Sequence, residues 1–356
     1  QDLWVCTSPS EMYNTLDQMP EWQIVGKQAY SKIKYIDVTA TLDIETYNQP
    51  EDGYIYTIQC NIRGQNFLCR YIEDFIDLCD RLIESLHLSE ELRLVFYVHN
   101  LGYETYYMMQ LLNEEWGIPN ILLTKSHKPL YIKWGNGIEF RDSLKLFQKS
   151  LAKATKGLPH EKMVGDLDYK YPYTPDTPLS PDAWNYCIND VQGLYEAIER
   201  LKAEHGYNQA TIPYTNTSMV IDAVNRECRE NGDMIRACYD LTLDKPMMRL
   251  AYKAMAGGDT HGTRWRAGQT FEDCNSYDLK SAHPSQQILD NFPSGKPQML
   301  KGIQSEPVLK TFCDDMGMGW IARVLITNLV IKPECPDPTI SVSKTDEIKE
   351  AYGYDT

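Results

Sequence analysis

Two acidic residues, Asp43 and Glu45, stand near the end of an apolar run and are separated by a single residue. The run, Ile33 to Ile44, mixes apolar residues, many of them β-branched, with polar ones, and this pattern predicts a buried strand. Because side chains alternate between the two faces of a strand, both carboxylates would project to the same side. Neighbouring carboxylates repel each other and lose solvation, and a divalent cation between them would offset that cost. The alternative is an ordinary strand end with two solvated acids.

Two further acidic residues could join this pair. Glu104 follows the predicted strand Leu92 to Val98, where the chain enters a helix, and Asp190 lies on a predicted helix from about Pro181 to Ala203. Tyr186 precedes Asp190 by four residues, so both side chains would lie on one helix face. Three or four carboxylates around a small volume suit Mg²⁺ or Mn²⁺. Two such ions about 3.5–4 Å apart can activate water and stabilise a leaving oxyanion in phosphodiester hydrolysis, and a neutral tyrosine hydroxyl can orient that water.

The elements that must position these side chains predict a mixed sheet with helices packed on it. Short turns join the first strand to two more strand-like runs, which together predict an antiparallel meander. The order of strands and helices favours an α/β (α+β) fold of the ribonuclease H-like type. The predicted elements after the first strand are strands at Tyr54 to Ile62 and Phe67 to Tyr71, a helix at Ile72 to Leu86, a helix ending near Leu112, and a hairpin of Leu130 to Trp134 with Ile138 to Asp142.

The rest of the chain contains one lysine-rich segment, a long loop and a change of character near residue 210. Four lysines, at 145, 149, 153 and 156, recur at four- and three-residue steps and would share one helix face, as a basic strip or as a plain solvated face. Residues 157–181 are rich in Gly, Pro and Tyr and predict a long loop. Later predicted elements are helices at Ser218 to Glu230, Lys245 to Ala256 and Ala282 to Leu289, and strands at Cys274 to Leu279 and Gly319 to Leu329.

The composition is typical of a soluble globular protein. The 356 residues are 42% hydrophobic and 24% charged, and the length is sufficient for two domains. No apolar run is long enough to predict a transmembrane helix, and ten scattered cysteines favour a reduced cytosolic protein over a disulfide scaffold or a zinc site. The net charge of −15 argues mildly against nucleic acid as a partner, although a local basic strip can outweigh it.

Taken together, the acidic segments resemble the three exonuclease motifs of family B DNA polymerases. Asp43-Ile44-Glu45-Thr46 is similar to the first motif, Asp-x-Glu-Thr, and the segment from His99 to Glu104 is similar to the second, in which an Asn is followed by an aromatic residue and an acid. Tyr186-Cys187-Ile188-Asn189-Asp190 is similar to the third, Tyr-x-x-x-Asp. The set resembles a DEDD-type 3′–5′ exonuclease with the tyrosine variant of the third motif, except that the family has Asp where this chain has Glu104.

This resemblance implies a role for each acid. Asp43 would contact both ions, Glu45 and Asp190 would complete one site, and Glu104 would support the other. Tyr186 would orient the attacking water.

The resemblance also implies substrate contacts around the acids. Thr46, Asn100 and Tyr103 would contact substrate, with Tyr103 near the primer terminus. The alternatives are a turn-capping role for Asn100 and a core position for Tyr103, and His99 is expected to be a satisfied buried histidine.

Other segments resemble the protein-primed branch of the family, which occurs in phages and linear plasmids. Ser143-Leu144 matches that branch's Ser/Thr-Leu element, which contacts single-stranded DNA, and Gly165-Asp166-Leu167-Asp168-Tyr169 resembles its segment before the third motif. The branch places a catalytic lysine near this segment, and Lys162 is the nearest candidate. A solvated loop lysine is the alternative.

The second half of the chain resembles the opening of a polymerase palm. The segment Asn275 to Pro284 is similar to polymerase motif A, in which Asp278 would hold a metal ion against triphosphate oxygens. Gly257 and Gly258 resemble part of a Tyr-x-Gly-Gly linker that contacts template DNA, with a plain helix C-cap as the alternative. Residues 319–344 resemble the region after motif A that carries an insertion in this branch. The later lysine and Asp-Thr-Asp motifs do not occur, so residues 1–356 alone are expected not to polymerise.

These observations predict an N-terminal arm (1–30), a 3′–5′ exonuclease domain (31–215) and a partial palm (216–356). The expected function is two-metal proofreading within a fragment or truncated form of a protein-primed DNA polymerase. Expected partners are single-stranded 3′ ends, primer–template DNA and a terminal priming protein, in the cytoplasm of a bacterial host and away from any membrane. The alternatives are a stand-alone nuclease on DNA or RNA and a non-catalytic nucleic-acid-binding module in which Glu104 marks a decayed site.

Overall fold

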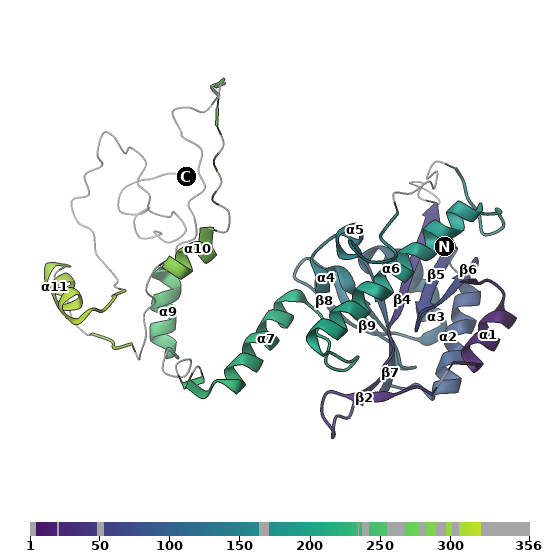
Figure 1. The fold of residues 1–356 in the computed structure, drawn as a ribbon, viewed down its shortest axis with the longest axis horizontal. Helices are drawn as coiled ribbons and strands as arrows, with labels where there is room; N and C mark the ends of the chain where they lie inside the picture. The colour runs from purple at the N-terminus through teal and green to yellow at the C-terminus, as the bar shows by residue number, and fades with distance from the viewer. Residues whose placement is uncertain are drawn as a thin grey trace. The chain divides into compact units, whose positions relative to one another are not determined.

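A computed structural model describes most of the first 254 residues and shorter stretches beyond them (Figure 1). Packing divides the chain into two units, Gln1–Asn225 and Arg226–Thr356, and each is considered by itself. The domain limits at residues 30 and 215 remain predictions. The described ranges are 5–19, 21–47, 53–163, 171–233, 235–236, 242–254, 268–272, 274–275, 277, 279, 282–289, 297–300 and 306–321.

The described part of the first unit is built on a ten-stranded mixed sheet. Antiparallel pairs join β4 to β5 and β5 to β6, which confirms the predicted meander, while β4 and β10 both run parallel to β7. The main path, in spatial order, is β1 (Val5–Cys6), β6 (Gln65–Cys69), β5 (Tyr54–Ile62), β4 (Ala40–Tyr47), β7 (Leu92–Val98), β10 (Ile138–Asp142), β9 (Pro129–Lys133) and β8 (Asn120–Leu123). Beside this path, β2 (Ile24–Gly26) pairs with β3 (Lys34–Ile36), and β3 pairs with the start of β7.

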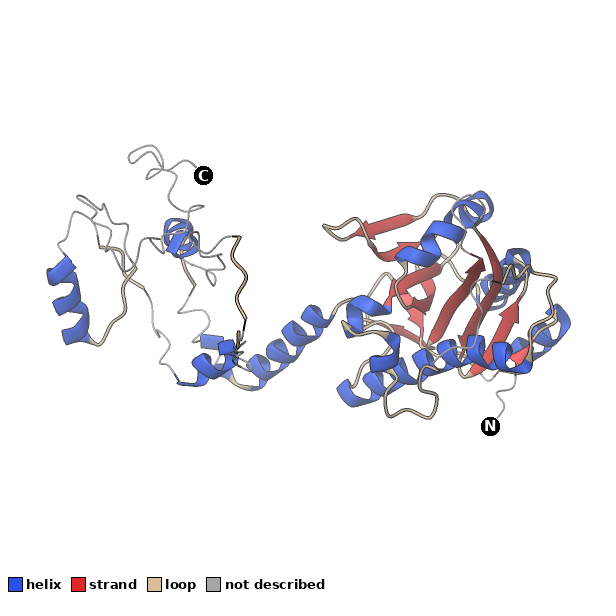
Figure 2. Cartoon of the chain, turned by 90° about the horizontal axis from the view of Figure 1, so that it is seen from above, coloured by secondary structure: helices blue, strands red, loops and turns tan. Residues whose placement is uncertain are grey.

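Helices cover both faces of this sheet (Figure 2). Along β7, Phe96 and Val98 belong to the core under α2 (Ile72–Leu86), whereas Val95 and Tyr97 belong to the core under α6 (Pro181–His205). A strand that is apolar on both sides reads as a continuous hydrophobic run, which is why Leu92 to Val98 could be assigned from sequence. The strand β5, the helix α2 and the strand β7 have the predicted bounds.

The first predicted strand is two strands. The run from Ile33 to Ile44 forms β3, leaves the sheet in a turn in which the Val38 N–H donates to the Ile36 carbonyl (2.8 Å), and re-enters as β4. Strand β4 continues to Tyr47, so Asp43 and Glu45 lie within the strand and not near its end.

The predicted lysine strip is wrong. Helix α4 (Ser143–Phe147) ends at Gln148, whose backbone is left-handed (φ 51°), and the chain restarts as α5 (Leu151–Ala154). A left-handed residue breaks the helical repeat, so the four lysines do not share one helix face.

The predicted N-terminal arm (1–30) contains regular elements. Helix α1 (Pro9–Asp17) begins with a reciprocal capping box between Ser8 and Glu11 and buries Met12 and Leu16. Strand β1 extends the sheet beside β6. Helix α3 (Gly102–Trp116) follows β7, as predicted, and ends four residues later than expected.

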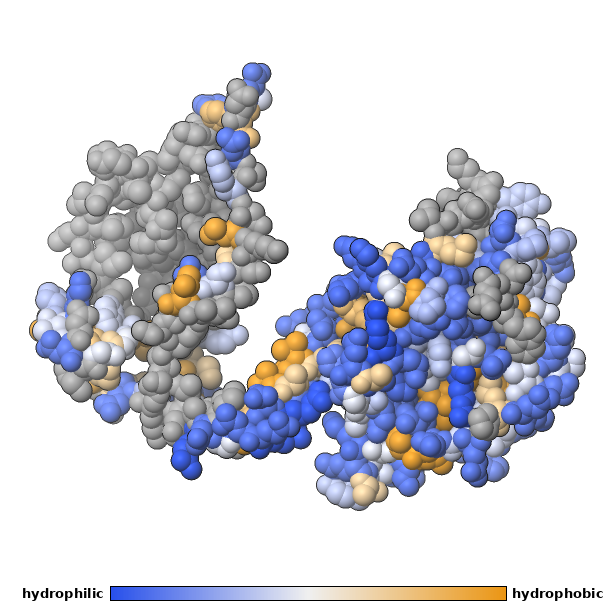
Figure 3. Space-filling model, in the orientation of Figure 1, coloured by the Kyte–Doolittle hydropathy of each residue, from blue (hydrophilic) through white to orange (hydrophobic). Residues whose placement is uncertain are grey.

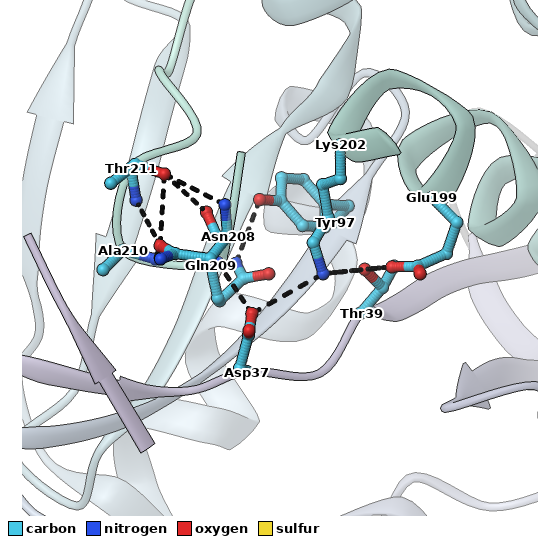
Figure 4. Close-up of polar contacts among 9 residues, drawn as sticks. All are labelled: Asp37, Thr39, Tyr97, Glu199, Lys202, Asn208, Gln209, Ala210 and Thr211. Atoms are coloured by element: carbon cyan, nitrogen blue, oxygen red, sulfur yellow. Dashed lines mark hydrogen bonds and ion pairs between the residues drawn. The ribbon is translucent and has the colours of Figure 1, made fainter. Parts of the chain in front are cut away.

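Polar contacts fasten the end of α6 and the segment after it to the sheet (Figure 4). Lys202 Nζ lies 3.7 Å from Asp37 Oδ1 and 3.3 Å from Thr39 Oγ1. The Gln209 backbone N–H donates to Asp37 Oδ1 (2.9 Å), and Gln209 Nε2 donates to the Tyr97 hydroxyl (2.9 Å). These contacts hold α6 across the turn between β3 and β4.

Helices dominate the remaining described residues. They are α7 (Asn216–Glu230), α9 (Lys245–Ala254), α10 (Ala282–Leu289) and α11 (Glu306–Met316). Helix α7 exposes Val220, Ile221 and Val224, and apolar surface is visible along it in Figure 3. None of the helices in the described ranges is long and apolar enough to span a bilayer.

Two predicted strands of the second half are not formed where the structure describes them. Residues 274, 275, 277 and 279 carry no strand, and neither do residues 319–321. Gly257, Gly258 and Asp278 lie outside the described residues.

Replacing Gly137 by Ala should destabilise the first unit by about 2–4 kcal/mol. Gly137 sits between β9 and β10 with φ 95°, and an added Cβ would lie 2.6 Å from the Ser89 nitrogen and 2.7 Å from the Leu92 oxygen. Gly135, in the same turn, has open space around its Cβ position, so Gly135→Ala is the matched control and should change stability by less than about 0.5 kcal/mol. Urea unfolding followed by tryptophan fluorescence measures both, and equal losses would contradict the assignment.

Candidate active site

A cavity of about 510 Å³ opens where β4, α3 and α6 meet. Strand β4 places both of its acids on the face that α6 covers, since Leu42 and Ile44 point into the opposite core. Seven of the lining residues are predicted site residues. The lining consists of Asp43, Ile44, Glu45, Thr46, Tyr103, Lys162, Tyr186 and Asp190.

Three carboxylates converge in this cavity. Ligand oxygens of Asp43, Glu45 and Asp190 all lie within 4.8 Å of one another. Helix α6 brings Asp190 there because its backbone is tied to β4, where the Thr41 hydroxyl donates to the Val191 carbonyl (2.8 Å). Residues far apart in the sequence therefore form one anionic cluster.

The cluster fits a divalent cation. Asp190 and Glu104 are each 3% exposed, and Asp190 Oδ1 and Glu104 Oε2 have no hydrogen-bond partner among the described residues. Unpaired buried carboxylate oxygens are costly. A donor set made only of carboxylate oxygens is suited to Mg²⁺ or Mn²⁺.

Burial makes these acids hard to ionise. It raises the pKa of Asp43 to about 7, with the charge of Asp190 as the second cause, and it raises the pKa of Glu45 with help from Asp43. Burial and then Asp43 raise the pKa of Glu104 to about 9. Glu104 stands in the first turn of α3, close enough to feel both β4 acids, although it does not line the cavity itself.

Lys162 is part of the cluster and not a solvated loop lysine. Its ammonium group contacts the Asp190 carboxylate and lies 5.2 Å from the centre of the Tyr186 ring. Its segment is held in place, since the Lys162 N–H donates to Thr155 Oγ1 (2.9 Å) and Asn189 Nδ2 donates to the Glu161 carbonyl (2.6 Å). Tyr186 lies one turn before Asp190, as predicted, and also lines the cavity.

Tyr103 stands at the mouth of the cavity and is not a core aromatic. The residue is 37% exposed, its hydroxyl is hydrogen-bonded to the Thr46 hydroxyl, and its ring lies against that of Tyr107 with ring centres 5.2 Å apart. Both Thr46 and Tyr103 could therefore meet a ligand that enters.

The structure does not bring three other predicted contacts into the cavity. Ser143 is fully buried, donates to the Val98 carbonyl (3.1 Å) and lies 3.1 Å from His99 Nδ1. Leu144 and Asn100 both donate a backbone N–H to Asp142, and Asn100 makes the turn into α3 with φ 82°. Their DNA contacts stay predictions.

His99 is partly buried, and its Nε2 has no hydrogen-bond partner among the described residues, so the prediction of a satisfied buried histidine is wrong. Burial lowers its pKa to about 4, so the ring is neutral at physiological pH.

Sequence analysis missed Gln59. This residue lies opposite Asp43 on β5, and its Nε2 donates to Asp43 Oδ2 (3.3 Å). A signal was available, because Thr57, Gln59 and Asn61 alternate with apolar residues and mark a polar face on an otherwise apolar strand.

In a chelating buffer, the free energy of unfolding should fall as pH rises from about 5 to 9. The folded pKa values of Asp43 (about 7) and Glu104 (about 9) lie above those of the unfolded chain. The folded state therefore binds more protons in this window, and its stability declines as they leave. Thermal denaturation across this range measures the slope, which should flatten in an Asp43→Asn, Glu104→Gln double variant. Stability that rises with pH in the parent chain would contradict the expectation.

Comparison with known proteins places the fold. No family model matches this chain, and no curated protein does either. Phi29 DNA polymerase complexed with single-stranded DNA matches with a TM-score of 0.51 and 17% identity, over 64% of this chain and 41% of that chain. The same polymerase complexed with primer-template DNA and incoming nucleotide substrates matches with a TM-score of 0.50 and 16% identity, over 64% of this chain and 40% of that chain.

The chain thus spans about 40% of the length of the polymerase it matches. Identity at this level shows a shared fold alone. The described fold is the ribonuclease H-like α/β fold that the sequence predicts, and it is similar to that of Phi29 DNA polymerase.

Proposed function

We propose that the first unit is a metal-dependent 3′–5′ exonuclease that removes terminal nucleotides from DNA in the proofreading step of a protein-primed DNA polymerase. The observation that carries this proposal is the convergence within 4.8 Å of Asp43 and Glu45 from the first predicted motif and Asp190 from the third. Likeness of fold to a polymerase solved with single-stranded DNA supports DNA as the substrate.

In this proposal Asp43, Glu45 and Asp190 hold the cations. Glu104, which does not line the cavity, supports them. Mg²⁺ or Mn²⁺ ions, when bound, would activate water and stabilise the leaving oxygen of the phosphodiester. The three carboxylates lie close enough to share a cation, and the resemblance to the exonuclease motifs assigns Asp43 as the ligand shared by both ions. A bound cation would also favour the ionised forms of these acids.

Lys162 and Tyr186 line the same cavity beside Asp190. Burial lowers the pKa of Lys162, but Asp190 and the other carboxylates more than compensate, so its pKa is raised and it stays an ammonium. That charge can stabilise a phosphate in the cavity. The Tyr186 phenol can orient a water by accepting or donating one hydrogen bond.

Tyr103 and Thr46 would receive the terminal nucleotide. An exposed tyrosine ring can stack on a base, which is worth about 1–3 kcal/mol. DNA contacts by Asn100, Ser143 and Leu144 rest on the resemblance alone.

The second unit is assigned, on its sequence, to the opening of a polymerase palm. Asp278 would be its metal ligand, and Gly257 and Gly258 would approach template DNA. A terminal protein as priming partner and a bacterial host cytoplasm belong to the same proposal.

Asp43→Asn and Glu45→Gln should each abolish degradation of single-stranded DNA, with a rate loss of about 1,000-fold or more, since each removes an ionisable ligand. The assay follows a 5′-labelled oligomer with Mg²⁺ or Mn²⁺. Glu204→Gln is the matched control, because Glu204 is an exposed acid on the helix that carries Asp190. Undiminished degradation in the Asp43 and Glu45 variants would refute the assignment. An RNA oligomer of the same sequence degraded faster than DNA would favour a stand-alone nuclease on RNA.

Tyr186→Phe should lower kcat by about 10–100-fold and leave KM and Mn²⁺ affinity unchanged. Phenylalanine keeps the ring beside Lys162 and loses only the hydroxyl that orients water. Tyr195→Phe on the same helix is the control, since Tyr195 lies against Gly64 and outside the cavity. A raised KM with unchanged kcat would show that the hydroxyl binds substrate and does not act in the reaction.

A further inference from the structure

Strand β5 presents a buried polar face to α6. Thr57, Gln59 and Asn61 are all 0% exposed, while Ile58 and Cys60 between them belong to the core on the other side of the sheet. Buried polar side chains are costly unless they are paired. The partners of each residue therefore show what this face does.

Asn61 has a structural role. Its Nδ2 donates to Asn66 Oδ1 (2.7 Å) and to Gln192 Oε1 (2.9 Å), and its Oδ1 accepts from the Gly64 N–H (2.9 Å). These contacts join the turn between β5 and β6 to α6, and none of them involves the acidic cluster.

Gln59 is turned toward the acidic cluster. Its Nε2 donates to Asp43 Oδ2 (3.3 Å). The amide therefore holds the Asp43 carboxylate from the neighbouring strand.

Thr57 and Asp43 together orient this amide. The Thr57 hydroxyl donates to Gln59 Oε1 (3.0 Å), and the ionised Asp43 carboxylate, which only accepts hydrogen bonds, requires the NH₂ end. A flipped amide would turn its oxygen toward that carboxylate and lose the hydrogen bond to Asp43. An amide held in this way donates to the carboxylate and leaves the cation to the charged ligands.

We propose that Gln59, oriented by Thr57, is a positioning residue for Asp43. It holds the carboxylate in the rotation in which Asp43 meets Glu45 and Asp190, and so increases the affinity of the cluster for a divalent cation that it does not touch. The inference rests on the proposed function only in taking a divalent cation as the occupant of the cavity. Hydrogen-bond partners of metal ligands typically change metal affinity about 10–100-fold.

The test is Mn²⁺ binding without DNA, measured on the full chain by electron paramagnetic resonance of the free ion. Gln59→Leu should raise the dissociation constant about 10-fold or more. Thr57→Val, which frees the amide and keeps its donors, should raise it by a smaller factor, about threefold. Asn61→Leu is the matched control, because it removes equally buried hydrogen bonds from the same strand face, and its affinity should stay within about twofold of the parent. Urea unfolding of each variant shows how much fold stability was lost.

Unchanged affinity in Gln59→Leu would overturn the proposal, and so would an Asn61→Leu variant that loses as much affinity as Gln59→Leu. If Gln59→Leu does not fold, Thr57→Val decides, and unchanged affinity there overturns the proposal. The Asp43→Asn variant shows whether Mn²⁺ binds through Asp43, and this result together with the DNA assay separates the role of Gln59 from the exonuclease proposal. A parent that binds Mn²⁺ through Asp43 and degrades no DNA refutes the exonuclease, while weaker binding by Gln59→Leu still supports the role of Gln59. A parent that binds no Mn²⁺ refutes both.

Discussion

The first unit depends on one electrostatic constraint, the placement of helix α6 over two carboxylates of strand β4. Bringing Asp190 against Asp43 and Glu45 gathers like charges in a buried place, which is unfavourable by itself. Lys162 offsets part of that cost through its contact with Asp190, and Gln59 offsets part of it through its hydrogen bond to Asp43. The remaining excess of negative charge is suited to a doubly charged cation.

The helix stays in this unfavourable position because contacts outside the cavity hold it. The Thr41 hydroxyl ties β4 to the residue after Asp190, and Asn189 holds the segment that carries Lys162. Lys202 and Gln209 fasten the far end of α6 and the chain beyond it to Asp37 (Figure 4). Apolar burial of Leu194 and Ile198 against β7 supplies stabilisation that does not depend on charge. Contacts along the helix therefore offset the electrostatic repulsion between the acids.

Local patterns predicted much of this architecture. Alternation alone placed Asp43 and Glu45 on one face, and apolar spacing gave α2 its correct ends. The four-residue spacing predicted that Tyr186 and Asp190 share one helix face. The resemblance to three ordered motifs predicted that Asp190 lies near Asp43.

Features that depend on distant partners could not be predicted in this way. The break between β3 and β4 is set by the pairing of each strand with a different part of β7. The lysine segment is divided at Gln148, whose backbone is left-handed although it is not a glycine, so the sequence does not predict the break. Ser143 looks like a surface serine in sequence, and only the packing of α4 against β7 buries it beside His99. Gln59 meets Asp43 through the register of β4 and β5, which is a long-range property.

The pair formed by Tyr103 and Thr46 has a consequence for how an incoming strand would be read. Because Tyr103 is 37% exposed and its hydroxyl is held by Thr46, a nucleotide that enters would meet an aromatic ring fixed at the mouth of the cavity. Every base has a π-face, so such a surface accepts purines and pyrimidines alike. In the proposed exonuclease, this contact would not discriminate between bases at the 3′ end. A mispaired end would be chosen because it unpairs more readily and reaches the cavity more often.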